Sequence, residues 1–362
     1  MGKKVMIGMS GGVDSSVAAA LLLEQGYEVV GVTLKLWAED SEEQELARPS
    51  GGCCSLDDIH DARMVAFKLG IPHYVLNFKE VFRKNVVDYF VEEYQRGRTP
   101  NPCIACNRHI KFEGLLDKAL TMGFDFIATG HYAKIIPNSE SGRLELHRGD
   151  SMKKDQSYVL YHFTQHQLAH MLLPLAQMDK DQTRAIAERY GLSIAKKPDS
   201  QEICFVPDQD YAAFIERYTG HKSVPGNFID STGNVLGIHK GIWHYTIGQR
   251  KGLGIAFGVP MFVTGIDVEH NTVTLGLEEG IFRTTLSAGD LNFIEIEKLT
   301  EPMAIQAKIR YSAIPAPALL IPAEGGKMGQ VVFDQPQRAV TPGQAVVFYH
   351  GESVVGGGTI LG

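Results

Sequence analysis

Residues 3–36, KKVMIGMSGGVDSSVAAALLLEQGYEVVGVTLKL, decide the fold. A short apolar run at 3–9 is followed by a glycine-rich turn, by the helical pattern SSVAAALLLEQG at 15–26 and by a second apolar run at 27–36. Strand, helix and strand in this order are typical of a β–α–β unit, whose two strands pair in parallel. The segment therefore predicts an α/β protein.

The same alternation continues to about residue 130. Strand patterns recur as IPHYVLNF at 71–78 and FDFIATGHYAKI at 124–135, and amphipathic helical patterns lie before and between them. Gly26 and Gly70 stand where two of the helices should end, as C′ residues. We therefore expect a parallel sheet with helices on both faces.

The pattern of the chain changes after this sheet. Between about 151 and 220 it is helical, with YVLYHFTQHQLAHMLL at 158–173 as a main segment. After Gly220, glycine and proline recur roughly every eight to twelve residues between short β-rich runs, as in antiparallel sheets and small barrels. We expect three domains: a parallel-sheet domain with a helical extension at 1–210, a central β-rich domain at 211–278 and a C-terminal β-barrel at 279–362.

Composition places broad limits on the function. The chain has 362 residues, which is too long for one ordinary hydrophobic core. No apolar stretch approaches the length of a membrane span, and the N-terminus runs into a strand pattern without a secretory signal, so we expect a cytoplasmic protein with no membrane partner. The net charge of −7 does not by itself indicate a nucleic-acid partner, although local basic clusters such as Arg250 and Lys251 exist.

The turn after the first strand, SGGVDS at 10–15, carries a chemical signal. A glycine-rich strand-to-helix turn exposes backbone N–H groups at a helix N-terminus, and these groups with the hydroxyls of Ser10 and Ser15 can hold an anion. The turn has neither the G-K-[ST] ending of a Walker loop nor a G-x-G-x-x-G spacing, which disfavours γ-phosphate hydrolysis and dinucleotide binding. It predicts a phosphate site; the plainer alternative is a turn that only links strand and helix.

Two cysteines, Cys103 and Cys106, lie in TPNPCIACNRHIKF, on a loop that leads into a helix. The helix N-terminus and the nearby cations Arg108 and Lys111 favour the thiolate form, which makes Cys106 a candidate nucleophile. A C-x-x-C motif in a chain without an export signal favours thiol chemistry or metal binding.

The other three cysteines are Cys204, in SQEICFV, and the adjacent pair Cys53 and Cys54. Cys204 follows Cys106 by about a hundred residues, and this distance along the chain does not exclude proximity in space. Adjacent cysteines rarely bridge each other, so we interpret Cys53 and Cys54 as a buried helix entrance, with a role in metal or sulfur handling as the alternative.

The loop SGGVDS resembles the S-G-G-x-D-S signature of the PP-loop ATP pyrophosphatase superfamily. The resemblance implies that the loop holds the pyrophosphate of ATP while the α-phosphate is transferred to an oxygen of the substrate, which gives AMP and pyrophosphate. Asp14 is expected to assist through Mg²⁺ or by orienting the loop. The ATP-binding residues implied by the resemblance are Gly8, Met9, Ser10, Gly11, Gly12, Val13, Asp14, Ser15, Leu34 and Gly130.

Longer stretches resemble the tRNA-specific 2-thiouridylase family. They are SGGVDSSV at 10–17, GRTPNPCIACNRHIKF at 97–112, TGHYA at 129–133, KDQSYVL at 154–160, PDSQEICFV at 198–206 and GIWHYTIGQRKGLGI at 241–255. The resemblance implies that ATP adenylates the 2-oxygen of a tRNA wobble uridine and that sulfur replaces this oxygen. It also implies that Cys204 receives a persulfide from a sulfur-carrier protein or a cysteine desulfurase, and that Cys106 attacks it or releases hydrosulfide. The two cysteines would then form a transient disulfide.

The family resemblance further implies contacts with tRNA. The loop Asn101–Pro102–Cys103 is expected to meet the target base, which has to be unstacked before it can react. His131 borders the same site; the alternative is a histidine at a strand end that is bonded to a carbonyl. The other tRNA contacts implied by the resemblance are Lys154, Asp155, Gln156, Arg310, Tyr311 and Gln344.

One position departs from the usual family pattern. Cys103 stands where an acidic residue is usual, which leaves the acid–base role of that carboxylate open. Because Cys103, Cys106 and Cys204 provide three thiols, a second hypothesis is a [4Fe–4S] cluster whose fourth iron carries the sulfur. A third is an inert or zinc-bound C-x-x-C motif with His109 as a further ligand. Two rival functions are a PP-loop synthetase for a small metabolite and an iron–sulfur or nucleotide-binding regulatory module.

Overall fold

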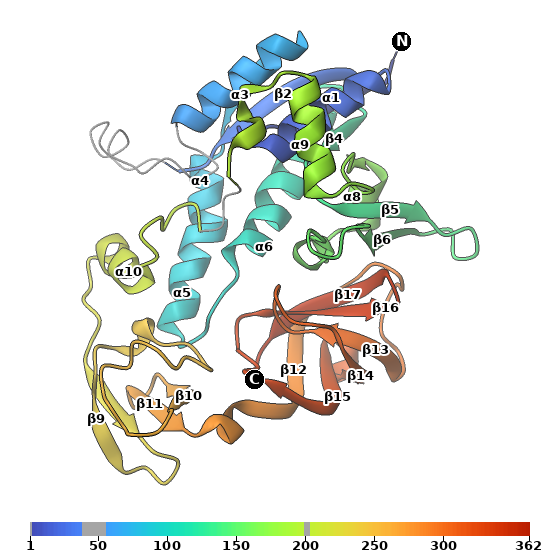
Figure 1. The fold of residues 1–362 in the computed structure, drawn as a ribbon. Coiled ribbons are helices and arrows are strands. Elements are labelled where there is room, and N and C mark those ends of the chain that lie inside the picture. The colour runs from blue at the N-terminus through green and yellow to red at the C-terminus, as the bar shows by residue number, and fades with distance from the viewer. Residues whose placement is uncertain (1, 38–55, 199–202) are drawn as a thin grey trace. The chain divides into compact units, whose positions relative to one another are not determined.

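The computed structural model describes residues 2–37, 56–198 and 203–362, and Figure 1 traces their fold. Cys53 and Cys54, predicted to lie at a helix entrance, fall outside these residues. The described residues pack into two compact units. The first comprises those up to Val87 with Cys103–Gln209 and Glu352–Val354, and the second comprises Asp88–Pro102, Asp210–Gly351 and Val355–Gly362.

The first unit is built on a five-stranded parallel sheet in the order β3-β2-β1-β4-β7. Its strands are β1 (Lys4–Gly8), β2 (Glu28–Lys35), β3 (His73–Asn77), β4 (Phe126–Ala128) and β7 (Met171–Leu172). The central strand β1 has buried side chains at consecutive positions, Met6 and Ile7. Successive side chains point to opposite faces of a strand, so both faces of the sheet are covered.

Helices provide this cover. On one face, α1 (Val13–Glu24) packs with α3 (Leu56–Leu69) and α9 (Lys180–Arg189) in a core that includes Ile7. On the other face, a helix made of α6 (Pro102–Cys106), η2 (Asn107–Gly114) and α7 (Leu115–Thr121) brings Leu115 against Gly8. The predicted parallel sheet with helices on both faces is confirmed.

The prediction of a helical segment at 158–173 is only partly correct. These residues lie instead in η3 (Ser157–Leu160), α8 (Gln165–Ala169) and strand β7. Thr164 begins a separate helix because its side chain and that of Gln167 form a capping box. Strand β7 then pairs with β4, so that pairing in the sheet overrides the local helical pattern.

The second unit begins with α5 (Tyr89–Gln95) and α10 (Tyr211–Thr219), where Phe90 packs against Tyr211 and Phe214. A four-stranded sheet in the order β10-β11-β8-β9 follows, with Phe228 at the centre of its core. Its strands are β8 (Gly226–Ile229), β9 (Val235–His239), β10 (Phe262–Asp267) and β11 (Thr272–Gly276).

A β-barrel occupies the C-terminal part of the second unit. Its strands are β12 (Phe282–Phe293), β13 (Met303–Lys308), β14 (Ala316–Ala323), β15 (Met328–Arg338), β16 (Ala345–His350) and β17 (Ser353–Ile360). The barrel closes because β12 pairs with both β15 and β17. The prediction of two β-rich domains, the last a barrel, is confirmed, whereas the boundaries at 210 and 278 stay predictions. In the described ranges, no helix is long and apolar enough to cross a membrane.

Candidate active site

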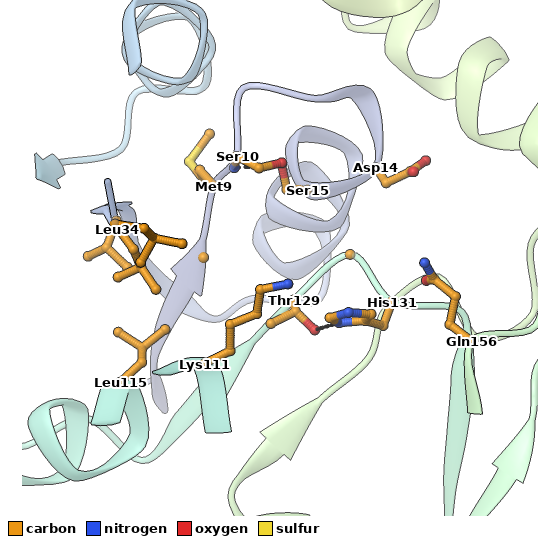
Figure 2. Close-up of a pocket in the computed structure, with 14 residues that line it drawn as sticks. Met9, Ser10, Asp14, Ser15, Leu34, Lys111, Leu115, Thr129, His131 and Gln156 are labelled. Carbon is orange, nitrogen blue, oxygen red and sulfur yellow. Dashed lines mark hydrogen bonds between the residues drawn. The ribbon is translucent and has the colours of Figure 1, made fainter. Parts of the chain in front are cut away.

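A cavity of about 190 Å³ lies in the first unit, at the carboxyl ends of strands β1, β2 and β4 (Figure 2). This edge is where open parallel sheets bind their ligands. The cavity is lined by Gly8, Met9, Ser10, Asp14, Ser15, Val32, Leu34, Leu36, Lys111, Leu115, Thr129, Gly130, His131 and Gln156. Seven of these fourteen residues belong to the set expected to bind ATP, while Gly11, Gly12 and Val13 of that set lie in the same turn but not on the cavity wall.

The glycine-rich turn forms the polar end of the cavity. The hydroxyl of Ser15 accepts a hydrogen bond from the backbone N–H of Ser10 at 3.2 Å, and Gly12 is the N-cap residue of α1. Gly11 has a φ of +72°, and a Cβ atom there would lie 2.3 Å from the carbonyl oxygen of Asp58. The turn therefore needs glycine at this position both for its backbone conformation and for its close approach to α3.

A second glycine permits a close approach on the opposite wall. A Cβ atom on Gly130 would lie 2.7 Å from the backbone nitrogen of Ser15. The loop after β4 thus touches the glycine-rich turn at 10–15, which we call the phosphate turn after its predicted role. The two glycines therefore permit close backbone approaches to the turn from α3 and from the loop after β4.

Asp14 is held by partners that the sequence did not indicate. The ammonium group of Lys180 on α9 donates to both carboxylate oxygens, at 2.7 and 2.9 Å, and the hydroxyl of Tyr132 donates to one of them at 2.7 Å. The Tyr132 hydroxyl also lies 3.0 Å from that of Thr183 on the same helix. These contacts balance the charge of Asp14 within the protein and connect the turn to α9.

Lys197 connects the turn to helix α3 through hydrogen bonds. Its ammonium group donates to the carbonyl oxygen of Gly11 at 3.2 Å, to Asp58 at 2.8 Å and to Asp61 at 2.6 Å. Burial lowers the pKa of Lys197, but the hydrogen bonds and charges of the two carboxylates outweigh burial and raise this pKa above its ordinary value. Lys197 therefore stays charged and links α3 to the phosphate turn.

His131 lies on the cavity wall as a neutral group. Its Nδ1 atom is 2.7 Å from the Thr129 hydroxyl, the contact drawn in Figure 2. Burial, and then the positive charge of Lys111, hold the pKa of His131 well below 6.5. An uncharged imidazole can accept or donate a hydrogen bond without repelling a neighbouring cation.

The apolar end of the cavity is formed by strand β2 and by α7. Leu34, expected to lie over the adenine, contributes to this wall with Leu36 and with Leu115 of α7. An apolar slot next to a loop of backbone donors matches a nucleotide, which has a flat base at one end and phosphates at the other.

The three described cysteines differ in exposure. Cys103 is exposed, whereas Cys106 and Cys204 are partly exposed. Phe205, next to Cys204, is buried and packs with its ring centroid 6.3 Å from that of Trp37 and 5.7 Å from that of Phe82. This packing fixes the backbone beside Cys204 to the first unit.

The predicted metal ligands are Cys103, Cys106 and Cys204 for iron, and His109 for zinc. Among the residues that the structure describes, no three histidine, cysteine or acidic side chains come together in a way that could hold a metal ion. His109, the candidate zinc ligand, has its Nδ1 atom 3.0 Å from a carboxylate oxygen of Glu113. Cys103, Cys106, Cys204 and His109, all among the described residues, are not gathered into such a group.

Hydrogen bonds hold the loop that contains Lys154, Asp155 and Gln156, which are predicted to contact tRNA. Asp155 is buried and accepts hydrogen bonds from the backbone N–H of Ser157 at 3.0 Å and from its hydroxyl at 2.9 Å. Gln156 accepts a hydrogen bond from the backbone N–H of Tyr132 at 3.0 Å. Asp155 and Gln156 therefore shape the loop, and Lys154 is partly exposed on it.

Gln344 supports the loop that is expected to meet the target base. Its side-chain nitrogen donates to the carbonyl oxygens of Thr99 at 2.8 Å and Pro100 at 3.3 Å, directly before Asn101 and Pro102. All of these residues belong to the second unit. A role for Gln344 in holding this loop needs no direct contact with RNA.

Arg310 and Tyr311 lie at the end of barrel strand β13. Arg310 donates to the carbonyl oxygen of Arg338 at 3.1 Å, and Tyr311 is 44% exposed. The ammonium group of Lys308 lies 5.5 Å from the centre of this ring. The sequence did not single out Lys308, which adds a second cation beside the exposed ring.

Comparison with known proteins identifies the family. A model described as "tRNA methyl transferase HUP domain" matches residues 3–208, and models described as "tRNA methyl transferase PRC-barrel domain" and "Aminomethyltransferase beta-barrel domain" match 212–277 and 283–360. The chain is 60% identical over 358 residues to the tRNA-specific 2-thiouridylase MnmA of Acetivibrio thermocellus, covering 99% of both chains. It is 56% identical over 360 residues to the protein of that name from Clostridioides difficile, covering 99% of this chain and 98% of the relative. On this full-length similarity, the chain belongs to the tRNA-specific 2-thiouridylase MnmA family.

Proposed function

We propose that the protein is a tRNA-uridine 2-sulfurtransferase that uses ATP to adenylate the 2-oxygen of a wobble uridine and then replaces this oxygen with sulfur. The observation that carries the proposal is the cavity at the end of β1, whose phosphate turn and apolar slot match a nucleotide. The helix α6–η2 reaches this cavity through Lys111 and carries Cys103 and Cys106 at its N-terminal end. Family membership supports tRNA as the substrate.

The first step activates the base. The 2-oxygen of uridine attacks the α-phosphorus of ATP, the bond from this phosphorus to the bridging oxygen breaks, and pyrophosphate leaves with the electron pair. N3 loses its proton, which gives an O-adenylated base with a double bond between C2 and N3. The turn at Ser10 and Ser15 would hold the departing pyrophosphate with backbone N–H groups and hydroxyls.

The second step delivers the sulfur. Cys204 carries a persulfide, and the Cys106 thiolate attacks the Sγ atom of Cys204, which releases hydrosulfide and leaves a disulfide between the two cysteines. Hydrosulfide adds to C2, AMP leaves with the electron pair of the C2–O bond, and the remaining proton moves to N3 to give 2-thiouridine. A thiol reductant then supplies two electrons to restore both cysteines.

The proposed mechanism treats Mg²⁺ and the iron–sulfur cluster differently. Mg²⁺ would enter with ATP, as part of the substrate. Asp14 would be its nearest carboxylate on the cavity wall, but both of its oxygens accept hydrogen bonds from Lys180. Because Cys103, Cys106 and Cys204 do not form a metal-binding group, no step is assigned to an iron–sulfur cluster.

The proposed partners follow from this chemistry. The tRNA would contact Lys154, His131 and the Asn101–Cys103 loop, and also Arg310 and Tyr311. A persulfide sulfur carrier or a cysteine desulfurase, acting in the cytoplasm, would load Cys204. We also propose the division into domains at 1–210, 211–278 and 279–362.

The test is a reaction of the purified protein with ATP, a cysteine desulfurase and cysteine as the persulfide source, a thiol reductant and unmodified tRNA that has a wobble uridine. The matched control is the same tRNA with cytidine at the wobble position. We expect one AMP and one pyrophosphate for each 2-thiouridine, and none of the three products with the control. Adenylation of a small acid without transfer of sulfur to tRNA, or no pyrophosphate release with any tRNA, would overturn the proposal.

A further inference from the structure

The charges on the cavity wall are few. Among its fourteen lining residues, Lys111 is the one lysine or arginine and Asp14 is the one carboxylate. Lys180 balances the charge of Asp14 through bonds to both of its oxygens. The positive charge that faces the interior of the cavity therefore comes from Lys111, and a nucleoside triphosphate brings several negative charges into this space.

Lys111 is aimed at the part of the cavity where the reaction has to occur. Figure 2 shows its side chain rising from the helix so that the ammonium group lies beside Thr129, below the turn that carries Ser10 and Ser15. The charge of Lys111 is also felt by His131, whose pKa it lowers. The ammonium group thus lies between the turn expected to hold pyrophosphate and the histidine expected to border the base, where the α-phosphate must sit.

The local helix geometry explains why Lys111 faces the cavity. Lys111 belongs to η2, a π-helical segment in which hydrogen bonds run from residue i to i+5, as in the bond from the N–H of Leu115 to the carbonyl of Ile110. Residues five apart, such as Cys106 and Lys111, then lie about one turn apart on the same face. In a regular α-helix they would be rotated by roughly 140° from each other. The π-helical turn therefore places position 111 on about the same face of the helix as position 106, one turn farther along.

Tight packing accompanies this segment. A Cβ atom on Gly114 would lie 2.8 Å from the ring of Phe78 and 3.2 Å from the carbonyl oxygen of His109. Only glycine fits there without displacing the helix from Phe78. Segments of π-helix are costly and are often found at functional sites.

We propose that Lys111 is a catalytic residue of the activation step, where its ammonium group binds a non-bridging oxygen of the α-phosphate. This inference rests on the proposed function. As the bond from the uridine 2-oxygen to the α-phosphorus forms and the bond to pyrophosphate breaks, negative charge grows on the non-bridging oxygens, and Lys111 stabilises it. Lys111 keeps all its protons throughout; the electron pair leaves with pyrophosphate.

The test compares Lys111→Met and Lys111→Gln with Lys111→Arg, and uses Lys118→Met as a matched control. Lys118 lies seven residues farther along the same helix, is exposed and does not line the cavity. The measurements are the Kd for ATP, the kcat of tRNA-dependent AMP formation and the rate of sulfur incorporation. We expect Lys111→Met and Lys111→Gln to lower the kcat of AMP formation by about 10²–10³-fold, because a donor that stabilises transition-state charge is worth this much.

The other outcomes separate the alternatives. We expect the Kd for ATP to rise less than tenfold in both variants, Lys111→Arg to recover part of the rate, and Lys118→Met to match the wild type. If Lys111→Met and Lys111→Gln form AMP at the wild-type rate, the inference is wrong; a defect confined to sulfur incorporation would also overturn it and assign Lys111 to the thiolate of Cys106. A wild-type protein that forms no AMP with tRNA would instead overturn the proposed function.

Discussion

Lys180 binds Asp14 with both carboxylate oxygens within hydrogen-bond distance, at 2.7 and 2.9 Å, and so fixes the phosphate turn to helix α9. The two side chains are 13% and 32% exposed, so that water screens this pair only in part. A pair in such a position is worth more than one on the open surface. The turn therefore depends on a helix that follows it by more than 150 residues.

Lys180→Met should weaken ATP binding, because it leaves the Asp14 carboxylate facing the phosphates without its counter-charge. Loss of hydrogen bonds between charged groups predicts a rise in the KM for ATP of about tenfold to a hundredfold. Arg189→Met on the same helix is the control, since Arg189 is 60% exposed and pairs with Glu24 on the surface. The double variant Lys180→Met, Asp14→Asn should recover part of the loss; equal KM values for the wild type and Lys180→Met would contradict the assignment.

Gly11→Ala should abolish ATP binding while Gly26→Ala should not. Both glycines have positive φ angles, +72° and +84°, but a Cβ atom on Gly11 would meet the Asp58 carbonyl at 2.3 Å, whereas one on Gly26 would meet nothing within 4 Å. Gly26→Ala should cost only about 1 kcal/mol of stability, the strain of an alanine in the left-handed region. Thermal unfolding with and without ATP measures both effects, and ATP-dependent stabilisation of Gly11→Ala would count against the proposed site.

Lys197→Met should destabilise the first unit and weaken ATP binding together. It removes the positive charge that Lys197 places beside Asp58 and Asp61 near the phosphate turn, and the Asp58 side chain is only 7% exposed. The expected loss is about 1–3 kcal/mol of unfolding free energy. Adding Asp58→Asn and Asp61→Asn to Lys197→Met should restore ATP binding if charge repulsion is the cause. A triple variant as weak as Lys197→Met would point to the lost contact with Gly11 instead.

The phosphate turn and its strand–helix context could be predicted from the sequence because the signal is local. The letters SGGVDS, the apolar run before them and the helical pattern after them all lie within a few dozen residues. Gly26 and Gly70 were predicted as C′ residues for the same reason, and they do have positive φ angles. The family prediction is likewise confirmed, since it depended on long stretches of matching sequence.

Contacts between distant segments could not be predicted in this way. Lys180 and Lys197 reach the turn from segments that follow it by more than 150 residues, and neither lysine has a local pattern that differs from a solvated surface. The short strand β7 was missed because its pairing with β4 outweighs a helical apolar pattern. The burial of Asp155 could not be predicted from the sequence either, because its hydrogen bonds with Ser157 depend on the conformation of the loop.

His131 predicts a dependence of stability on pH. Its pKa in the folded protein lies well below 6.5, so the folded state binds fewer protons than the unfolded state between these two values. The contribution of neutral His131 to stability is therefore complete above about pH 6.5 and is lost as the pH falls below it, at up to about 1.4 kcal/mol per pH unit. His131→Gln should lose less stability than the wild type between pH 7 and pH 5. An NMR titration in which the His131 ring is protonated near pH 6.5 would contradict this.

The role of Cys103 separates the two sulfur hypotheses. In the relay, Cys106 and Cys204 do the chemistry, so Cys106→Ser and Cys204→Ser should each abolish thiolation under reducing conditions while ATP binding is kept. Cys103 is exposed and has no step in the relay, so Cys103→Ser and Cys103→Asp should retain thiolation within a few-fold of the wild type. The measurement is 2-thiouridine formed per tRNA, after aerobic purification and after anaerobic reconstitution with iron and sulfide. A cluster on three thiols requires Cys103 as a ligand. Reconstituted protein with a cluster absorbance and higher activity, both lost in Cys103→Ser and Cys103→Asp, would replace the relay with iron–sulfur chemistry.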